Sequence, residues 1–512
     1  MTSRLRSFVV PLLLVSLVAL PASVTALAGN DDLDAIVTRL GSASMRDRIM
    51  GLRDMMRLKV PAEKARPILE KMIQDPSAEV RAELVWTIYE LLGGKGADLL
   101  EKLYADPDHK VRDGALRAAC RMWDVPDARD LCRAGMDDPD HRARIEVINT
   151  LKEFFPHDPE AAALFRRGLQ DPSEMVQRSA VFGAQAARDP EAVPLLARVL
   201  RESSDLAAVP AADEALATIG TDEAVDVLVS VLPRPKGEPG KPARPTDAVR
   251  AAAARALARI RNPKALPALR KALDDPSLIV RLGAMEAILQ MKDRKAAPLV
   301  CRQLGDKEER IRRFALRVLH QLGDTTCLDR IRDMMFHDPV PTIRATATVT
   351  YADLVGEKAI PDLLKLREDL DWSVRLEAAG SLAGLGKPAA KALAEFLEDT
   401  NADVRAMAIT GLGQIGGPDQ VPALARLITD KGKKNRQVRM AVAEALGSIG
   451  GAEGVPVLAE LAADPDPAVR QRAATSLGRI GGAEARKTLE VLAKDRVPSV
   501  RRAARTALES MK

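Results

Sequence analysis

The sequence predicts an all-α protein, an α-solenoid or superhelix of about fifteen stacked helix pairs, and two observations favour this class. The first is a phrase, Asp-Pro-x-x-x-Val-Arg or a close variant, that recurs at a mean period of about 32 residues. The second is the composition. Hydrophobic residues make up 46% of the 512 residues but aromatic residues only 3%, so Ala, Leu, Val and Ile must form the core. Such a core suits thin layers of closely packed helices and argues against large globular domains with aromatic-rich pockets.

The repeated phrase places an Asp and an Arg six positions apart. Ten copies keep both residues. Five further residues stand where the Arg is expected, in less regular surroundings: Arg48, Gln177, Val209, Arg250 and Arg439. Together these positions define the fifteen copies. The ten complete pairs are Asp75/Arg81, Asp106/Arg112, Asp138/Arg144, Asp275/Arg281, Asp306/Arg312, Asp338/Arg344, Asp369/Arg375, Asp399/Arg405, Asp464/Arg470 and Asp495/Arg501.

Each copy predicts two helices separated by a short turn. In residues 263–291, leucines at helical spacing mark the apolar face of the first helix. Asp275 and Pro276 end that helix, because Pro cannot continue a helix and Asp can cap the next one. The second helix is expected to begin near Val280. Neither helix buries its apolar face alone, so neighbouring pairs are expected to stack.

These residues resemble HEAT repeats, in particular the short bacterial type first recognised in phycobilisome lyases, and the resemblance covers residues 31–512. It implies that the helix before each Asp lines the convex side and that the helix carrying each Arg lines the concave side. It also implies that the ten Asp/Arg pairs form a structural ladder of hydrogen bonds between adjacent repeats. The alternative is a basic stripe of ten arginines that binds a polyanion. We favour the ladder, because each Arg has its own Asp nearby.

Residues 1–28 are predicted to be a secretory signal peptide. Arg4 and Arg6 precede an apolar run over residues 8–20, and small residues ending at Ala28 form an A-x-A cleavage pattern. The run is shorter than the roughly 20 residues that span a bilayer, which argues against the alternative of an uncleaved membrane anchor. The mature chain is therefore expected to be exported, periplasmic or secreted, with no integral membrane segment after signal cleavage.

Two arrays of HEAT-like repeats are expected on either side of a Pro- and Gly-rich basic insertion loop at residues 233–247. The N-terminal repeats cover residues 29–232 and the C-terminal repeats cover residues 248–512. The repeat before the loop carries Val209 in place of the ladder Arg, so we expect a slight discontinuity there. A smaller basic segment, residues 431–436, also interrupts the pattern. Each loop is either a recognition element or a neutral, solvated insertion.

The chain offers little material for catalysis. None of its five His lies in an H-E-x-x-H motif or directly precedes a Glu, and its four Cys show no C-x-x-C spacing. Cys120 and Cys132 fall on adjoining helices and either pair as a disulfide or stay as small packing residues. Catalytic residues, a cofactor and a bound metal are therefore not predicted, and the protein is not expected to be an enzyme.

The charge pattern argues against a nucleic-acid ligand. Lys and Arg number 77 against 72 Asp and Glu, which gives a net charge of only +5. Charged residues expected on the concave helices alternate in sign. No continuous track for phosphates is therefore predicted.

The predicted function is a non-catalytic scaffold that binds an unidentified protein partner on the concave face. Arginine and aromatic side chains are the residue types most often found as interface hot spots. The candidate contact residues are Trp86, Phe182, Arg255, Phe314 and Arg317, with burial in the core as the alternative for the three aromatics. Two alternative functions stay open. One is an accessory subunit of a lyase-like protein-modifying enzyme, and the other is a binder of anionic cell-envelope polymer through the two basic loops.

Overall fold

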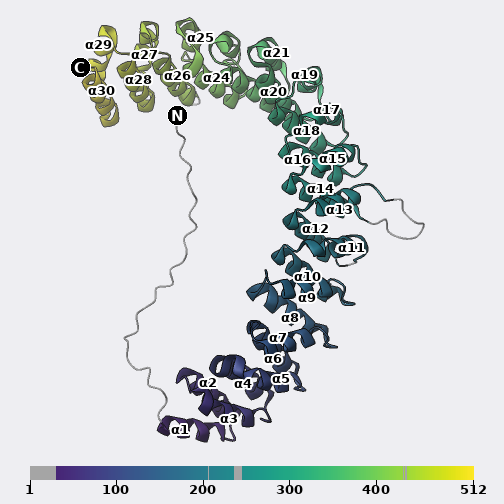
Figure 1. Cartoon of the computed structure of the whole chain (residues 1–512). Coiled ribbons are helices and arrows are strands. Elements are labelled where there is room, and N and C mark those ends of the chain that lie inside the picture. Colours follow the sequence, from purple (N-terminus) through teal and green to yellow (C-terminus); the bar gives the residue numbers. More distant parts are fainter. Residues whose placement is uncertain are drawn as a thin grey trace. The chain divides into compact units, whose positions relative to one another are not determined.

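The computed structural model describes most of the chain, namely residues 30–203, 205, 207–235, 245–429, 432 and 435–511. Within these ranges every regular element is a helix and none is a β-strand (Figure 1). Two compact units follow each other along the chain, the first ending at Ile219 and the second beginning at Gly220. The predicted signal peptide, residues 1–28, lies outside the described residues.

The helices of each unit are short and follow one another closely. The first unit contains α1 (Asn30–Leu40), α2 (Met45–Arg57), α3 (Ala62–Met72), α4 (Ala78–Leu92), α5 (Ala97–Tyr104), α6 (His109–Arg121), α7 (Pro126–Gly135), α8 (His141–Phe154), α9 (Pro159–Gly168), α10 (Glu174–Ala187), α11 (Val193–Glu202) and α12 (Ala208–Ile219). The second unit contains α13 (Asp222–Val231), α14 (Asp247–Ile260), α15 (Leu266–Ala272), α16 (Leu278–Gln290), α17 (Ala297–Gln303), α18 (Glu309–Leu322), α19 (Leu328–His337), α20 (Pro341–Val355), α21 (Ile360–Lys365), α22 (Trp372–Gly384), α23 (Ala390–Ala394), α24 (Ala402–Ile415), α25 (Val421–Arg426), α26 (Arg436–Ile449), α27 (Val455–Leu461), α28 (Pro467–Ile480), α29 (Ala483–Leu492) and α30 (Pro498–Ser510).

In the described part of the chain these helices form fifteen consecutive pairs, each an odd-numbered helix followed by an even-numbered one. Within each unit, every even-numbered helix packs on the even-numbered helix of the next pair. In the second unit the even-numbered helices lie on the inner side of the curve and the odd-numbered helices on the outer side (Figure 1). The predicted all-α solenoid of about fifteen HEAT-like helix pairs is confirmed.

The repeated phrase builds the turn inside each pair. After α5, the carboxylate of Asp106 accepts the main-chain N–H of Asp108 at 2.8 Å. Asp108 in turn caps α6 by accepting the N–H of Lys110 at 2.8 Å. Pro107 between them has no N–H to donate and cannot extend α5. The phrase therefore ends one helix and begins the next within a few residues.

Small residues let successive even-numbered helices approach each other closely. A β-carbon on Gly413 of α24 would lie 2.9 Å from the Cα of Ala445 in α26. A β-carbon on Gly478 of α28 would lie 3.1 Å from the Cα of Ala507 in α30. Larger side chains at these two positions would separate the helices. Cys120 occupies the same phase in α6, where it is fully buried.

The sequence suggested a division at the insertion, residues 233–247. The boundary between the two units lies earlier in the chain, between Ile219 and Gly220. It coincides with the C-terminal end of α12. Val209 stands at the ladder position of α12, so this helix has no guanidinium to offer the following repeat. Residues 236–244 of the insertion lie outside the described residues, as do residues 431, 433 and 434 of the second basic segment.

Two disulfide bonds join neighbouring repeats. Cys120 at the end of α6 is bonded to Cys132 in α7, with their Cα atoms 5.5 Å apart. Cys301 in α17 is bonded to Cys327 just before α19, with a Cα separation of 6.0 Å. The sequence left the first pairing open and gave no sign of the second, since only the stacking of repeats brings Cys301 and Cys327 together.

Candidate functional site: the ladder and an inner groove

A ladder of ion pairs connects successive repeats. In ten repeats the guanidinium at the ladder position donates to the carboxylate of the Asp in the following repeat, 24 to 27 residues further along the chain. The shortest nitrogen–oxygen distances are 2.5 to 2.9 Å in the nine pairs other than Arg250–Asp275. The pairs are Arg48–Asp75, Arg81–Asp106, Arg144–Asp171, Arg250–Asp275, Arg281–Asp306, Arg312–Asp338, Arg344–Asp369, Arg375–Asp399, Arg439–Asp464 and Arg470–Asp495.

This pairing corrects the expectation that each Arg pairs with the Asp six residues before it. That Asp offers its main-chain carbonyl oxygen to the Arg, because its carboxylate is engaged by the preceding repeat and by its own turn. All ten predicted pairs follow this rule. Arg81, Arg112, Arg144, Arg281, Arg312, Arg344, Arg375, Arg405, Arg470 and Arg501 donate to the carbonyls of Asp75, Asp106, Asp138, Asp275, Asp306, Asp338, Asp369, Asp399, Asp464 and Asp495.

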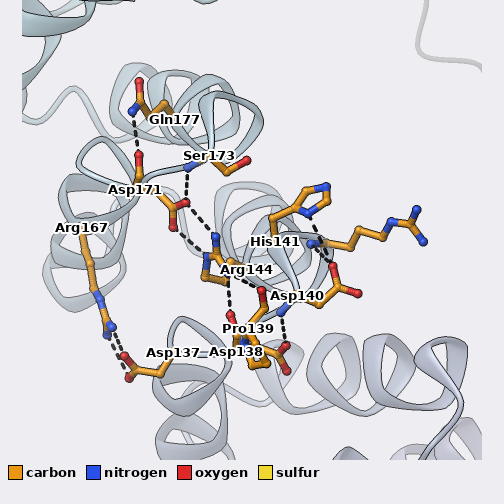
Figure 2. A network of polar contacts seen from close by, with 11 residues as sticks. Asp137, Asp138, Pro139, Asp140, His141, Arg144, Arg167, Asp171, Ser173 and Gln177 are labelled. Atoms are coloured by element: carbon orange, nitrogen blue, oxygen red, sulfur yellow. Dashed lines mark hydrogen bonds and ion pairs between the residues drawn. The ribbon is translucent and has the colours of Figure 1, made fainter.

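Figure 2 shows one rung in detail. Arg144 donates from Nε to Asp171 at 2.7 Å and from a terminal nitrogen to the carbonyl of Asp138 at 2.6 Å. The other carboxylate oxygen of Asp171 accepts the N–H of Ser173 at 2.8 Å. Gln177 takes the place of the next ladder Arg and donates its side-chain amide to the carbonyl of Asp171 at 2.7 Å. One arginine thus ties its own turn to the turn of the next repeat.

Two rungs depart from this pattern. The carboxylate of Asp138 accepts the hydroxyl of Tyr104 at 2.7 Å, while Arg112 donates to main-chain carbonyls. Burial and the neighbouring Asp138 carboxylate raise the pKa of Tyr104, so this phenol stays protonated as a donor. The second departure is at Gln177, which stands at a ladder position. The next residue, Arg178, donates from Nε to the carboxylate of Asp205 at 2.6 Å. The ladder therefore keeps its hydrogen bonds where its usual arginine is missing or occupied.

The ladder carboxylate of Asp399 stays ionised although it is largely buried. For Asp399, burial raises the pKa, but the hydrogen bonds from Arg375 and from the N–H of Asn401 outweigh it and lower the pKa below its usual range. The hydrogen bond to Asp399 raises the pKa of Arg375. Both partners are consequently charged at neutral pH, and the arginines of the ladder are engaged within the fold.

A groove of about 850 Å³ lies on the inner helices of the second unit. Its walls come from α14, α16, α18, α20 and α22. Half-buried apolar side chains line it: Leu282, Phe314, Val349 and Leu376. Four arginines stand at its surface: Arg255, Arg310, Arg313 and Arg317. Hydroxyl groups, two acidic side chains and a histidine also line it, beside Gly283 and Ala345: Thr342, Thr346, Thr350, Ser373, Glu286, Glu377 and His320.

Three of the four arginines in the groove have no acidic partner in the described residues. Arg313 donates to Glu309 and to the hydroxyl of Thr342. No carboxylate of the described chain lies within ion-pair distance of Arg255, Arg310 or Arg317. The guanidinium of Arg317 lies over the ring of Phe314, 4.2 Å from its centroid. The groove therefore presents unpaired positive charge beside an apolar strip.

The even-numbered helices of the first unit carry a separate cluster of aromatic residues. The guanidinium of Arg121 in α6 lies 5.2 Å from the ring centroid of Trp86 and 4.7 Å from that of Phe154. Phe182 in α10 is 41% exposed, and the ammonium of Lys152 lies 5.8 Å from its ring centroid. These contacts are cation–π pairs between even-numbered helices of that unit.

The structure brings three of the five candidate contact residues into one site. Arg255, Phe314 and Arg317 all line the groove of the second unit. Trp86 and Phe182 belong to α4 and α10 of the first unit and are not part of that groove. Trp86 is half-buried, whereas Phe182 is exposed.

Several residues of the groove were not among the predicted contact residues, although a simple count along the repeats finds them. Arg255 and Arg317 each stand five positions after a ladder arginine. The same register in α16 and α20 leads to Glu286 and Val349, and both line the groove. Arg310 stands two positions before a ladder arginine, as Thr342 and Ser373 do, and Leu376 stands one position after one, as Leu282 and Arg313 do. The sequence alone does not show which repeats contribute to the groove, because that depends on the packing of neighbouring helices.

No metal site is evident in the described residues, where no group of three or more His, Cys, Asp or Glu side chains is placed to hold an ion. Two histidines of the second unit, His320 in the groove lining and His337, lie next to carboxylates. His320 lies 2.9 Å from Asp353, and His337 lies 2.8 Å from Asp333. None of the helices in the described ranges is long and apolar enough to cross a membrane.

The family model for HEAT repeats matches residues 96–174, 163–239, 243–315, 360–437 and 431–509, and the chain therefore belongs to the HEAT-repeat family. HEAT-repeat solenoids are typically non-catalytic scaffolds that bind proteins. The narrower resemblance to the repeats of phycobilisome lyases is not confirmed. A search of curated proteins found none that matches the sequence.

Solved structures of the karyopherin Kap121p share the fold. The structure bound to the extreme C-terminus of the protein phosphatase Cdc14p matches with a TM-score of 0.51 and 12% identity, over 95% of this chain and 70% of that chain. The structure bound to Ste12p matches with a TM-score of 0.54 and 12% identity, over 95% of this chain and 65% of that chain. At this identity the likeness shows the solenoid fold alone.

Proposed function

We propose that this chain is an exported, non-catalytic scaffold that binds a partner protein on the inner helices of its second unit. The groove across α14 to α22 carries the proposal. It combines an apolar strip with exposed arginines and an aromatic ring, the combination that protein interfaces use as anchors. Its volume of about 850 Å³ suits a short stretch of another chain.

Two further points support a protein as the partner. The ladder arginines are engaged inside the fold, so they do not form a basic stripe on the surface of the second unit. Karyopherin Kap121p, whose fold this chain shares, is bound to the extreme C-terminus of a phosphatase in one of its structures. A solenoid of this kind therefore has a precedent for seating a segment of another protein.

Capture of the partner by crosslinking tests this proposal. The chain from Gly29 to Lys512 is incubated with envelope extract of its source organism, crosslinked and analysed by mass spectrometry at low and moderate salt. We expect one abundant protein at both salts. Val349→Asp, which places a charge on the apolar strip, should reduce its capture at least about tenfold. Thr410→Asp adds the same charge at the equivalent exposed position of α24, outside the groove, and should leave capture unchanged.

Two results would contradict the proposal. One is capture that Val349→Asp and Thr410→Asp affect equally. The other is recovery only of polyanionic envelope material that moderate salt removes, which is the behaviour expected of a polymer binder that uses the basic loops.

Export is supported by the leader-like residues 1–28 and by the two disulfides, since structural disulfides persist in oxidising compartments and are rare in the cytosol. The expected mature protein begins at Gly29 and has no free thiol. Mass spectrometry of the protein from the envelope fraction or the medium, before and after reduction and alkylation, checks both points. A protein that keeps residues 1–28 and carries four free thiols would refute export.

A further inference from the structure

We infer that the groove of the second unit takes an acidic segment of the partner, with carboxylate side chains at its centre and apolar side chains beside them. The inference rests on the proposed function and adds to it the chemistry of the bound chain. It follows from the charges that the groove leaves unpaired, from the way one of them is held, and from the lining between them.

Three unpaired arginines gather in the groove. Some exposed arginines elsewhere in this unit have acidic partners, as Arg302 does with Asp274 at 2.8 Å, and others, such as Arg294, have none in the described residues. Arg255, Arg310 and Arg317 are exposed, lack acidic partners in the described residues and all line one groove. A planar guanidinium accepts a carboxylate through two parallel hydrogen bonds. Carboxylates on the partner would supply the missing counter-charges.

The arginines of α18 are arranged to act together. Arg310, Arg313 and Arg317 follow one another at helical spacing and all line the groove, so they share one face of the helix. Stacking on Phe314 restricts Arg317, and Arg313 is held by Glu309 and Thr342. Side chains that are already ordered lose less conformational entropy when a ligand binds. This face of α18 is therefore the centre of the site.

The lining on either side of α18 favours a protein segment over a nucleic acid or another polyanion. The side chains that α20 contributes to the groove are all uncharged, and Val349 lies among them. Glu286 on one side and Glu377 on the other would repel a continuous run of phosphates. A peptide can place carboxylates against α18 and apolar or basic side chains against these neighbours, whereas a uniform polyanion cannot.

Selection from a random-peptide display library tests the inference with the full mature chain as bait. The enriched peptides are sequenced, and the best binders are synthesised and measured by fluorescence anisotropy. We expect peptides with clustered Asp and Glu flanked by apolar residues. Arg310→Gln/Arg317→Gln should weaken their binding at least about tenfold, and replacing their Asp and Glu by Asn and Gln should do the same.

Arg294→Gln is the matched control, because Arg294 is exposed in the same unit, lies outside the groove and has no acidic partner in the described residues. This variant should bind like the unaltered chain. Enriched peptides that are neutral or basic but lose binding with Val349→Asp would overturn the acidic segment and leave the proposed function standing. Failure to enrich any peptide that depends on the groove would overturn both. A polyphosphate or DNA probe that binds the groove more tightly than every selected peptide would also overturn the inference.

Discussion

A single ladder arginine connects its own turn with the turn of the next repeat. Arg375 donates to the carbonyl of Asp369 in its own turn at 2.8 Å and to the carboxylate of Asp399 in the next repeat at 2.7 Å. The side chains of Arg375 and Asp399 are only 11% and 5% exposed. A buried pair of this kind adds little net stability compared with apolar side chains, but the loss of one partner leaves a buried charge without compensation.

Arg375→Met should therefore lower the free energy of unfolding by about 3 kcal/mol, because it strands the Asp399 carboxylate. Arg367→Met is the control. Arg367 pairs with Glu395 on the surface, where both side chains are about half exposed, and its loss should cost less than about 1 kcal/mol. Urea unfolding followed by circular dichroism measures both. Equal effects of the two substitutions would contradict the structural role of the ladder.

The ion pair between Asp362 and Arg332 on the outer helices should make the stability of the protein depend on pH. The carboxylate of Asp362 accepts two hydrogen bonds from Arg332, at 2.6 and 2.7 Å, and the hydrogen bonds from Arg332 and Lys365 lower its pKa to about 2. A lowered pKa in the folded state contributes stability above the unfolded pKa of about 4 and loses it as the pH falls towards 2. The difference in melting temperature between the unaltered chain and Asp362→Asn should be largest at neutral pH. Thermal unfolding over a pH series should show it shrinking between about pH 4 and pH 2, and a constant difference would contradict the assignment.

At the scale of the helix, the spacing between repeats depends on small side chains. Successive even-numbered helices pack on one another throughout each unit, and Gly413 and Gly478 sit where two of these helices meet. The odd-numbered helices pack mainly on the even-numbered helix of their own pair. In two places a disulfide also joins an odd-numbered helix to the neighbouring repeat. The inner helices therefore determine how closely the repeats stack.

Gly413→Val should destabilise the protein, because its β-carbon would lie 2.9 Å from a main-chain atom of Ala445 and force α24 and α26 apart. Overpacking of this kind typically costs about 1–3 kcal/mol. Gly384→Val is the control, since a β-carbon on Gly384 meets no atom within 4 Å. Chemical denaturation of both variants tests the prediction. It fails if Gly413→Val is as stable as Gly384→Val.

At the scale of the whole molecule, stability is built from contacts between neighbouring repeats. Each helix pair packs on its neighbours, so every unit carries its own core and its own ladder. The two units meet in sequence at Ile219 and Gly220, after the one helix whose ladder position is a Val. The groove belongs entirely to the second unit.

The fragment Gly220–Lys512 should consequently fold without the first unit. We expect a helical circular dichroism spectrum, a cooperative melting transition and the same peptide binding as the full chain, because all residues of the groove lie within this fragment. The residues 30–219, expressed separately, provide the control for binding and should not bind the selected peptides. An unfolded or aggregated fragment would show that the second unit depends on the first.

The number of helix pairs and the position of the turns within them could be predicted from the sequence, because these depend on local patterns within one repeat. A Pro after an Asp ends a helix wherever it occurs, and a period of about 32 residues repeats that effect along the chain. Three features depended on contacts between repeats: the pairing of each ladder Asp with the Arg of the preceding repeat, the disulfide between Cys301 and Cys327, and the groove. The groove draws on five helices that span residues 255–377, and their side chains become neighbours only when the repeats stack. The distance and rotation between stacked repeats are set by side-chain packing across helices, which no pattern within a single repeat contains.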